Sequence, residues 1–434
     1  MLAAGFWLVL ARAVGAASLG DVALATALST PAVVILDGGL AQYLVRESDA
    51  GGRLPRALRP ALRRRTVALV VLPVLVAAGT LLFGDTSQRL LIGLLVGASA
   101  SFEGAAQSWL SGPRARGNMR PDATFKGVYG ATSVSAVAIA WAAGELTGLL
   151  AAAATAAGAG VAAALAARHL PDGQRWQERE VTDPPAGRRF FQTTLLTSAF
   201  LSADVLLVGA LLGSAKLAPY ALATKIVAAL AVLPIATLRV SLSWAARGEG
   251  PTAAAEVRTG ARLGLGLALA GMAAGPFAAS LLFGDHYARA MTDPLRLLAL
   301  NLFVVSIKAP LAGRHLGAGD TALVARAAAI TLGVALVLIP VGTLAIGTAG
   351  AALGVLLAEA AGAVPFLRSR ARDGWSARDL IPSVPAAAIA LAAGAVALWL
   401  PPLSAAALAP AAVAVLAGAG VSFRAARRYS LRTP

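Results

Sequence analysis

The sequence predicts an all-α membrane protein with about 14 transmembrane helices. Hydrophobic residues make up 58% of the 434 residues and charged residues only 13%, whereas a soluble domain carries roughly 25% charged residues. The apolar residues fall into blocks of about 20, the length of a helix that crosses a bilayer. Apolar runs such as 149–167 and 385–400 also lack the apolar–polar alternation of a membrane barrel strand.

Polar breaks between the apolar blocks define the expected helices. The block at the N-terminus is too short to span a bilayer alone, which indicates a helix that is shortened at its start. The expected spans are 1–13, 21–43, 66–84, 88–110, 124–143, 147–167, 190–212, 218–245, 261–284, 294–312, 324–345, 347–367, 380–400 and 402–422.

The positions of the basic residues predict the orientation in the membrane. Most of the 37 Lys and Arg residues lie in alternate connections, beginning with 44–65 and ending with the C-terminal tail. Because cytoplasmic loops carry the excess of Lys and Arg, both termini are expected in the cytoplasm of a bacterial cell, with the helices in its inner membrane. The net charge of +16 is then explained by anionic lipid headgroups as the partner, and nucleic acid is not expected.

The residue inventory argues against an enzyme or a metal protein. The chain has no cysteine, and His169, His286 and His315 are expected in separate polar loops rather than in one metal site. No connection is long enough for a catalytic domain outside the membrane. A membrane-embedded polysaccharide polymerase or glycosyltransferase would need a clustered acid–base or metal set, and none is visible. No cofactor is expected, apart from a coupling H⁺ or Na⁺.

An internal repeat relates the two halves of the chain. Leu81–Asp85 recurs identically as Leu281–Asp285, and Val22–Thr26 resembles Tyr220–Thr224. Further pairs follow in the same order at an offset near 200 residues: Gly15 and Gly213, Leu110 and Leu311, Gly148 and Gly350, Gly160 and Gly362. Six helices, an even number, separate the copies. The halves are therefore expected to be parallel repeats, related by a pseudo-twofold axis along the membrane normal.

The repeat and the polar linker predict the domain organisation. Residues 1–168 form an N-terminal six-helix bundle, 169–189 a cytoplasmic linker, and 190–370 a C-terminal six-helix bundle. Residues 371–434 add two helices and a basic cytoplasmic tail. Parallel repeats usually place a substrate site at their interface.

Several motifs resemble a known family. The runs Ala11–Gly15 and Asp37–Glu47 resemble the opening of Wzx-like polysaccharide-biosynthesis flippases of the multidrug/oligosaccharidyl-lipid/polysaccharide (MOP) superfamily. Asp204 with Gly209–Gly213, Leu281–Gly284 with Tyr287, and Gly347, Gly350 and Glu359 resemble later parts of that family. The resemblance covers nearly the whole chain.

The resemblance implies a MATE-like fold with a central cavity that works by alternating access. It implies that the cargo is an undecaprenyl-pyrophosphate-linked oligosaccharide, flipped to the outer leaflet for surface or exopolysaccharide synthesis. It also implies the pathway's polymerase and glycosyltransferases as partners. A multidrug or metabolite exporter and a lipid II flippase of the same superfamily are the alternatives.

Charged side chains inside membrane helices are costly and usually functional, so they supply the site candidates. Because a pyrophosphate cargo favours cations, the proposed substrate-binding residues are mostly basic: Lys225, Arg239, Asp37, Arg12, Arg46 and Lys308. The proposed ion-coupling residues are Asp204, Glu359 and Glu103. Lys225 and Arg239 share one helix face, about 40° apart.

Each candidate also has a structural interpretation. Arg239, Arg46 and Lys308 could snorkel to the cytoplasmic interface, and Lys225 could pair with Asp204 or Glu359. The remaining interpretations are helix packing for Asp37, a headgroup contact for Arg12 and an interhelical bond for Glu103. Asn301 is a further, weaker candidate.

Overall fold

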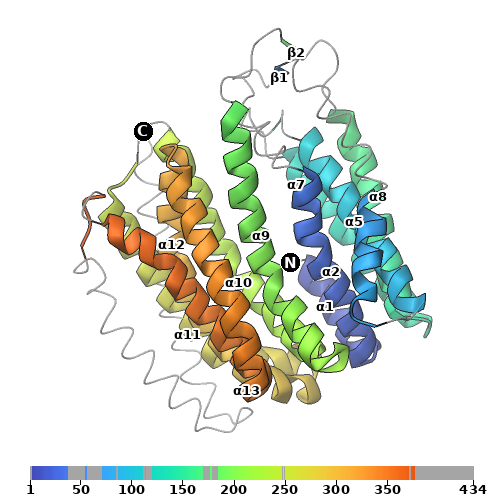
Figure 1. The fold of residues 1–434 in the computed structure, drawn as a ribbon. Helices are drawn as coiled ribbons and strands as arrows, with labels where there is room; N and C mark the ends of the chain where they lie inside the picture. Colours follow the sequence, from blue (N-terminus) through green and yellow to red (C-terminus); the bar gives the residue numbers. More distant parts are fainter. Residues whose placement is uncertain are drawn as a thin grey trace. The chain divides into compact units, whose positions relative to one another are not determined.

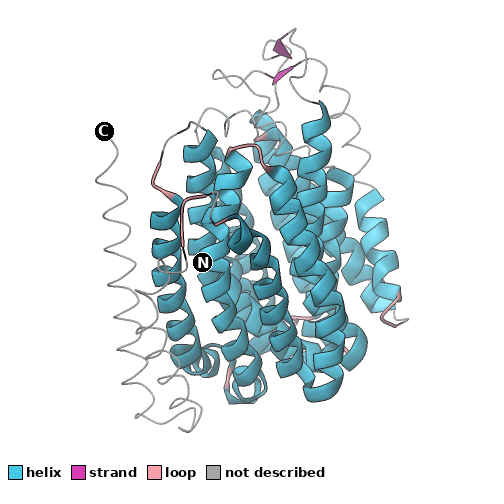
Figure 2. Cartoon of the chain, turned by 60° about the vertical axis from the view of Figure 1, so that its left-hand side comes forward, coloured by secondary structure: helices cyan, strands magenta, loops and turns pink. Residues whose placement is uncertain are grey.

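The protein is described here by a computed structural model, and nearly all of the described chain is helical (Figures 1 and 2). The predicted all-α class is confirmed. By its internal contacts the chain divides into two compact units, Met1–Ala218 and Pro219–Pro434. The structure describes residues 2–37, 54–55, 71–84, 87–110, 113, 120–169, 176–177, 184–246, 248, 250–370 and 373–376.

Unit 1 contains helices that match most of the expected spans. Two short strands, β1 (Leu54–Pro55) and β2 (Trp176–Gln177), pair in parallel. The helices are α1 (Leu2–Ala13), α2 (Ala16–Asp37), the short helix Val71–Leu81, α5 (Ser87–Trp109), α7 (Arg120–Ala142), α8 (Gly148–Ala166), the 3₁₀ turn Ala167–His169 and α9 (Pro184–Leu212).

Unit 2 contains longer helices than the sequence predicted. They are α10 (Ser214–Ala246), which begins just before the unit boundary, α11 (Ala253–Phe283), α12 (Asp285–Gly317) and α13 (Thr321–Ser369). The backbone of α13 leaves the helical conformation at Ile346 and Gly347. This break confirms the predicted separation of the spans 324–345 and 347–367, and we refer to the two parts as the first and second segments of α13.

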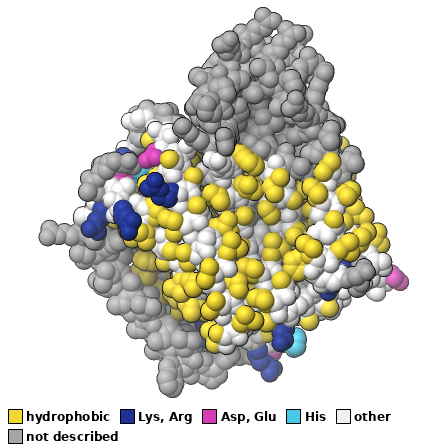
Figure 3. Space-filling view, viewed as in Figure 1, with side chains coloured by type: hydrophobic (Ala, Val, Ile, Leu, Met, Phe, Trp, Pro, Cys, Tyr) yellow, Lys and Arg dark blue, Asp and Glu magenta, His cyan; other side chains and the backbone are white. Residues whose placement is uncertain are grey.

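The helix lengths and surfaces are those of a multi-pass membrane protein. Eight described helices are long and apolar enough to cross a bilayer. Large apolar side chains such as Ile139 and Leu344 are about 70% exposed, and apolar surface covers the helices between their charged ends (Figure 3). Such surface is stable only against lipid or further protein. The expected pair of helices at 380–422 lies outside the described residues.

Helix breaks fall at matching positions of the internal repeat. Gly15 immediately precedes α2, and its counterpart Gly213 immediately precedes α10. Gly84 and Gly284 each follow a helix, with φ of 133° and 84°. Because residues with a side chain rarely adopt positive φ, glycine allows the chain to end one helix here and start the next.

The first helix after the expected linker belongs to unit 1. Helix α9 begins at Pro184, inside the stretch 169–189 that was expected to be a loop, and proline suits a first helical turn because the missing N–H is not needed there. Helix α9 packs against α2, which explains why the compact unit extends to Ala218. The division derived from the repeat stays a prediction.

Glycines hold the two segments of α13 in close contact. A Cβ on Gly350 would lie 1.8 Å from the carbonyl oxygen of Gly342, and one on Gly362 would lie 1.7 Å from Oγ1 of Thr331. Small residues let membrane helices approach this closely. The segments therefore form a tight helical hairpin.

Adding one methyl group at this contact should destabilise the hairpin. Gly350→Ala is expected to lower the free energy of unfolding by about 1–3 kcal/mol, because the backbone of Gly342 must move. Gly333→Ala is the matched control, since a Cβ at Gly333 meets nothing within 4 Å. Thermal unfolding in detergent would measure both variants, and equal midpoints would contradict this packing.

Candidate functional site

Unit 2 holds an ion pair in the membrane-spanning part of its helices. The Nζ of Lys308 on α12 donates a hydrogen bond to Oε2 of Glu359 on the second segment of α13. The Lys308 side chain is 18% exposed and that of Glu359 is 8% exposed. Neither group could stay charged alone at such a site without a large desolvation cost. The pairing therefore offsets the desolvation cost of both groups, and the Lys308 side chain stays partly exposed.

The two charges meet because they occupy the same depth on neighbouring helices. With a rise of about 1.5 Å per residue, Lys308 lies ~14 Å before the end of α12 and Glu359 ~15 Å before the end of α13. Helices α12 and α13 pack against each other. A lysine side chain is only four carbon atoms long, which is too short to reach the interface from this depth. Its ammonium group bonds to Glu359 instead. The interpretation of Lys308 as a snorkelling residue therefore does not fit the structure.

A buried amide lies on the same face of α12. Asn301 is 9% exposed, and its Oδ1 accepts no hydrogen bond in the described structure. Residues seven apart lie almost directly above one another on a helix, so Asn301 and Lys308 share a face. A buried acceptor without a donor costs free energy, and a hydroxyl-rich ligand would satisfy it.

Unit 1 contains a polar cluster that joins the starts of three helices. Asp21 on α2 accepts hydrogen bonds at Oδ1 from Nε of Arg89 on α5, at 2.9 Å, and from Oγ of Ser214 at the start of α10, at 2.6 Å. The Arg89 guanidinium also donates to Ser214 Oγ at 3.1 Å and to the carbonyl oxygen of Phe83. The backbones of α2 and of the start of α10 are also in close contact, because a Cβ on Gly20 would lie 2.0 Å from the carbonyl oxygen of Ser214.

A third cluster lies where α12 and α13 end in unit 2. His315 is 5% exposed, with Nδ1 3.4 Å from Oδ2 of Asp320 and Nε2 3.2 Å from Oδ2 of Asp373. Ser369 donates to the same Asp373 oxygen at 2.6 Å. His315 was expected in a polar loop, but α12 extends to Gly317 and buries it. His315 therefore connects the end of α12 to residues that flank α13, and it does not face solvent.

The other described site candidates lie on helices α1, α5, α9 and α10. Arg12 and Arg239 are exposed, and Lys225 and Glu103 are half-buried. Asp204 is buried in α9, where its Oδ1 accepts a bond from the backbone N–H of Val205 at 2.8 Å. Asp37 is the last residue of α2, but its side chain and all of Arg46 lie outside the described parts. Glu359, one of the two expected partners of Lys225, binds Lys308, and the pairing of Lys225 with Asp204 stays a prediction.

Sequence reasoning missed the Asp21–Arg89–Ser214 cluster entirely. Asp21 is the first residue of the expected span 21–43 and Arg89 the second residue of the expected span 88–110, so both were placed at span ends and neither counted as an intramembrane charge. The available signal was their position, because Asp21, Arg89 and Ser214 all lie within the first two turns of helices α2, α5 and α10. These helices begin at the same side of the membrane if the predicted alternation holds.

Three-dimensional comparison finds proteins of similar fold. No sequence-family model matches the chain, and no curated protein matches it by sequence. A structure of the lipid II flippase MurJ in an inward closed conformation superposes with a TM-score of 0.67 at 12% identity, covering 99% of this chain and 96% of the flippase.

Transporters of the MOP superfamily also match. An inward-facing multidrug resistance MATE transporter gives a TM-score of 0.62 at 14% identity, covering 86% of this chain and 93% of the transporter. A MOP superfamily transporter from Pyrococcus furiosus, described with a binding pocket of reversed polarity, gives 0.55 at 15% identity, covering 82% and 85%. The chain is thus a multi-pass membrane protein with the fold shared by these MOP-superfamily flippases and transporters.

Proposed function

We propose that the protein is a MOP-superfamily flippase that moves a polyprenyl-pyrophosphate-linked oligosaccharide from the cytoplasmic to the outer leaflet by alternating access. The observation that best supports this proposal is the share of the chain that each solved structure matches. The lipid II flippase matches 99% of this chain, whereas the MATE transporters match 82–88%. A chain with two helices beyond the two six-helix bundles is typical of flippase branches rather than of twelve-helix exporters.

The Lys308–Glu359 pair supplies the chemistry that such a cargo needs. A pyrophosphate entering the membrane must replace its water shell with fixed positive charge. Lys308 moves its hydrogen bond from the Glu359 carboxylate to a phosphate oxygen of the cargo. Glu359 is then left without its partner and takes up a proton or Na⁺. Binding of the cargo and of the coupling ion are thereby linked at one pair.

The same face of α12 offers a site for the sugar. The free Oδ1 of Asn301 lies two helical turns from Lys308 and accepts a hydrogen bond from a sugar hydroxyl. A site that hydrogen-bonds a hydroxyl discriminates against analogues that lack it. Asn301→Ala is expected to weaken cargo binding while leaving the Lys308–Glu359 pair intact.

The arginine distribution supports the orientation in the inner membrane of a bacterium. If both termini are cytoplasmic, the ends of α12 and α13 with His315 and Arg368 face the cytoplasm. The Asp21–Arg89–Ser214 cluster then lies at the outer side, where it holds together the starts of α2, α5 and α10.

Deletion of the gene tests the proposal. We expect polyprenyl-pyrophosphate-linked repeat units to accumulate in the cytoplasmic leaflet, with loss of the corresponding surface glycan, and mass spectrometry of extracted lipids would identify the units. Expression of the wild-type chain should reverse both effects. Unchanged glycans with altered drug tolerance would overturn the proposal and favour a multidrug exporter.

Lipid II is the second candidate cargo, because the flippase that covers 99% of the chain is named for it. The same deletion distinguishes the two. A lipid II flippase would be required for growth, and its depletion would cause lipid II to accumulate, whereas a flippase for surface glycan would leave lipid II unchanged.

A further inference from the structure

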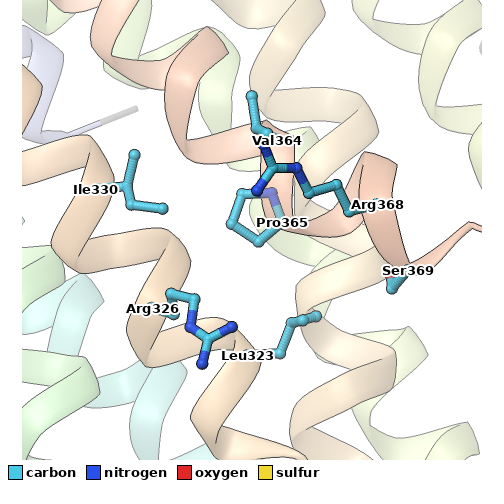
Figure 4. A pocket seen from close by; sticks show the side chains of 7 residues that line it. All are labelled: Leu323, Arg326, Ile330, Val364, Pro365, Arg368 and Ser369. Carbon is cyan, nitrogen blue, oxygen red and sulfur yellow. The ribbon is translucent and has the colours of Figure 1, made fainter.

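The hairpin of α13 encloses a groove near its open end. Its volume is about 350 Å³, and it lies beyond the close contact of Gly362 with Thr331, toward the start and end of α13. Figure 4 shows the seven lining residues, which all belong to α13: Leu323, Arg326, Ile330, Val364, Pro365, Arg368 and Ser369.

Two arginines, one from each segment, flank this groove. Arg326 belongs to the first segment and Arg368 to the second, and both extend toward the space between the segments (Figure 4). Both side chains are exposed. Among the described residues, no acidic side chain lines the groove and neither guanidinium forms an ion pair. Two guanidinium groups that face one space favour a phosphate, which they can bind through paired hydrogen bonds.

The floor of the groove is apolar, which restricts the kind of phosphate that fits. Leu323, Ile330, Val364 and Pro365 supply most of its lining. A free phosphate would satisfy the arginines but leave this floor exposed. An amphipathic phosphate covers both, with the headgroup between the guanidiniums and the glycerol and first chain carbons on the apolar residues.

We propose that this groove binds one anionic phospholipid of the membrane's cytoplasmic leaflet. The arginine distribution places the ends of α13 at that leaflet, where anionic headgroups attract basic residues. The lipid bridges the two segments of α13 at the end where no glycine contact joins them. This site is separate from Lys308 and Glu359 and does not depend on the identity of the transported cargo.

Lipid retention measured by native mass spectrometry tests the site. The full-length protein would be extracted from bilayers of phosphatidylglycerol and phosphatidylcholine, and lipid adducts counted during delipidation. Each of Arg326→Gln and Arg368→Gln should weaken phosphatidylglycerol binding about fivefold, and the double variant about 30-fold, as expected for arginines near an anionic surface. Phosphatidylcholine binding should not change.

Matched variants separate this site from general charge effects. Arg262→Gln/Arg289→Gln removes the same charge from exposed arginines outside the groove and should retain the lipid. Ile330→Trp keeps both arginines but fills the groove, and should also release the lipid. Equal retention in the double variant and its control would overturn the proposal.

Two further results would count against a phospholipid. Displacement by millimolar inorganic phosphate would indicate a free-anion site, and full retention in Ile330→Trp would indicate that only the headgroup binds. A cysteine at position 326 that forms disulfides with cysteines placed along 380–422 would show that this segment of the chain occupies the groove instead. Thermal unfolding of each variant would verify that it is folded.

Discussion

Replacing Lys308 by methionine is expected to abolish transport and to destabilise the protein. The change leaves the Glu359 carboxylate, which is 8% exposed, without its partner. Removing one member of a buried ion pair costs about 3–5 kcal/mol. Loss of a charge-assisted bond to the cargo phosphate adds a functional effect of about 10- to 100-fold on binding. Thermal unfolding and transport assays would measure the two effects separately.

The double variant Lys308→Met/Glu359→Gln separates structure from function. Neutral side chains of similar size often replace a buried pair without loss of stability, so the double variant should recover most of the lost unfolding free energy. It should not recover transport, because neither the phosphate ligand nor the coupling carboxylate is present. Recovery of both properties would mean that the pair only holds α12 and α13 together.

Lys216→Met is the matched control for this series. Lys216 is exposed in the first turn of α10, so the same substitution removes the same charge without breaking the described pair. Stability and transport should stay close to those of the parent. A loss equal to that of Lys308→Met would show that net charge, rather than the pair, determines the outcome.

Replacing Arg89 by glutamine is expected to open the outer side of unit 1. The substitution removes the bond to Asp21 Oδ1 and those to Ser214 and Phe83. Since the Arg89 and Asp21 side chains are 20% and 14% exposed, each lost charge-assisted bond should cost about 1.5–3 kcal/mol or less. Because the cluster then retains the Ser214–Asp21 bond but none of these Arg89 bonds, the start of α10 should separate from α2 and α5 more often.

Cysteine labelling measures this opening. The chain has no cysteine of its own, so a single introduced cysteine reports alone. Ala218 is fully buried, and Ala218→Cys should react slowly with a membrane-impermeant maleimide. Adding Arg89→Gln should increase the labelling rate several-fold. An unchanged rate in a folded double variant would contradict a role for this cluster in closure.

The internal repeat provides the control for Arg89. Arg289 lies at the offset of 200 residues and is exposed. The position that corresponds to Asp21 is occupied by Pro219, so the second half lacks the carboxylate. Arg289→Gln should therefore leave the labelling of Ala218→Cys unchanged.

The sequence predicted the fold through features that depend on local chemistry. Apolar blocks indicated the spans, and the gaps between these blocks indicated the helix breaks. Gly213, Gly284 and Gly347 have positive φ at three of these breaks, a local property that glycine satisfies without strain. The predicted helices of unit 2 were too short, because their ends were placed too close to the middle of each helix. The charged first turn of α12 and the Arg314–His315 end remain helical, since helices continue beyond the apolar core of a bilayer.

Side-chain pairing was harder to predict because it depends on which helices pack together. Lys308 and Glu359 could have been matched by their equal distance from helix ends, but that test requires knowing that α12 neighbours α13. Asp21 and Arg89 are distant in sequence and are joined only by tertiary packing. The sequence did not indicate the contacts of His315, because its two aspartates come from the connection after α12 and from the segment that follows α13.

Translocation by the purified protein tests the central claim most directly. Proteoliposomes would contain a polyprenyl-pyrophosphate-linked oligosaccharide in both leaflets, and an impermeant glycan-cleaving enzyme would be added outside. We predict that the wild-type chain makes the inner-leaflet glycan accessible to cleavage, while Lys308→Met leaves it protected. An inner-leaflet pool that stays protected with correctly inserted, folded wild-type protein would contradict the account.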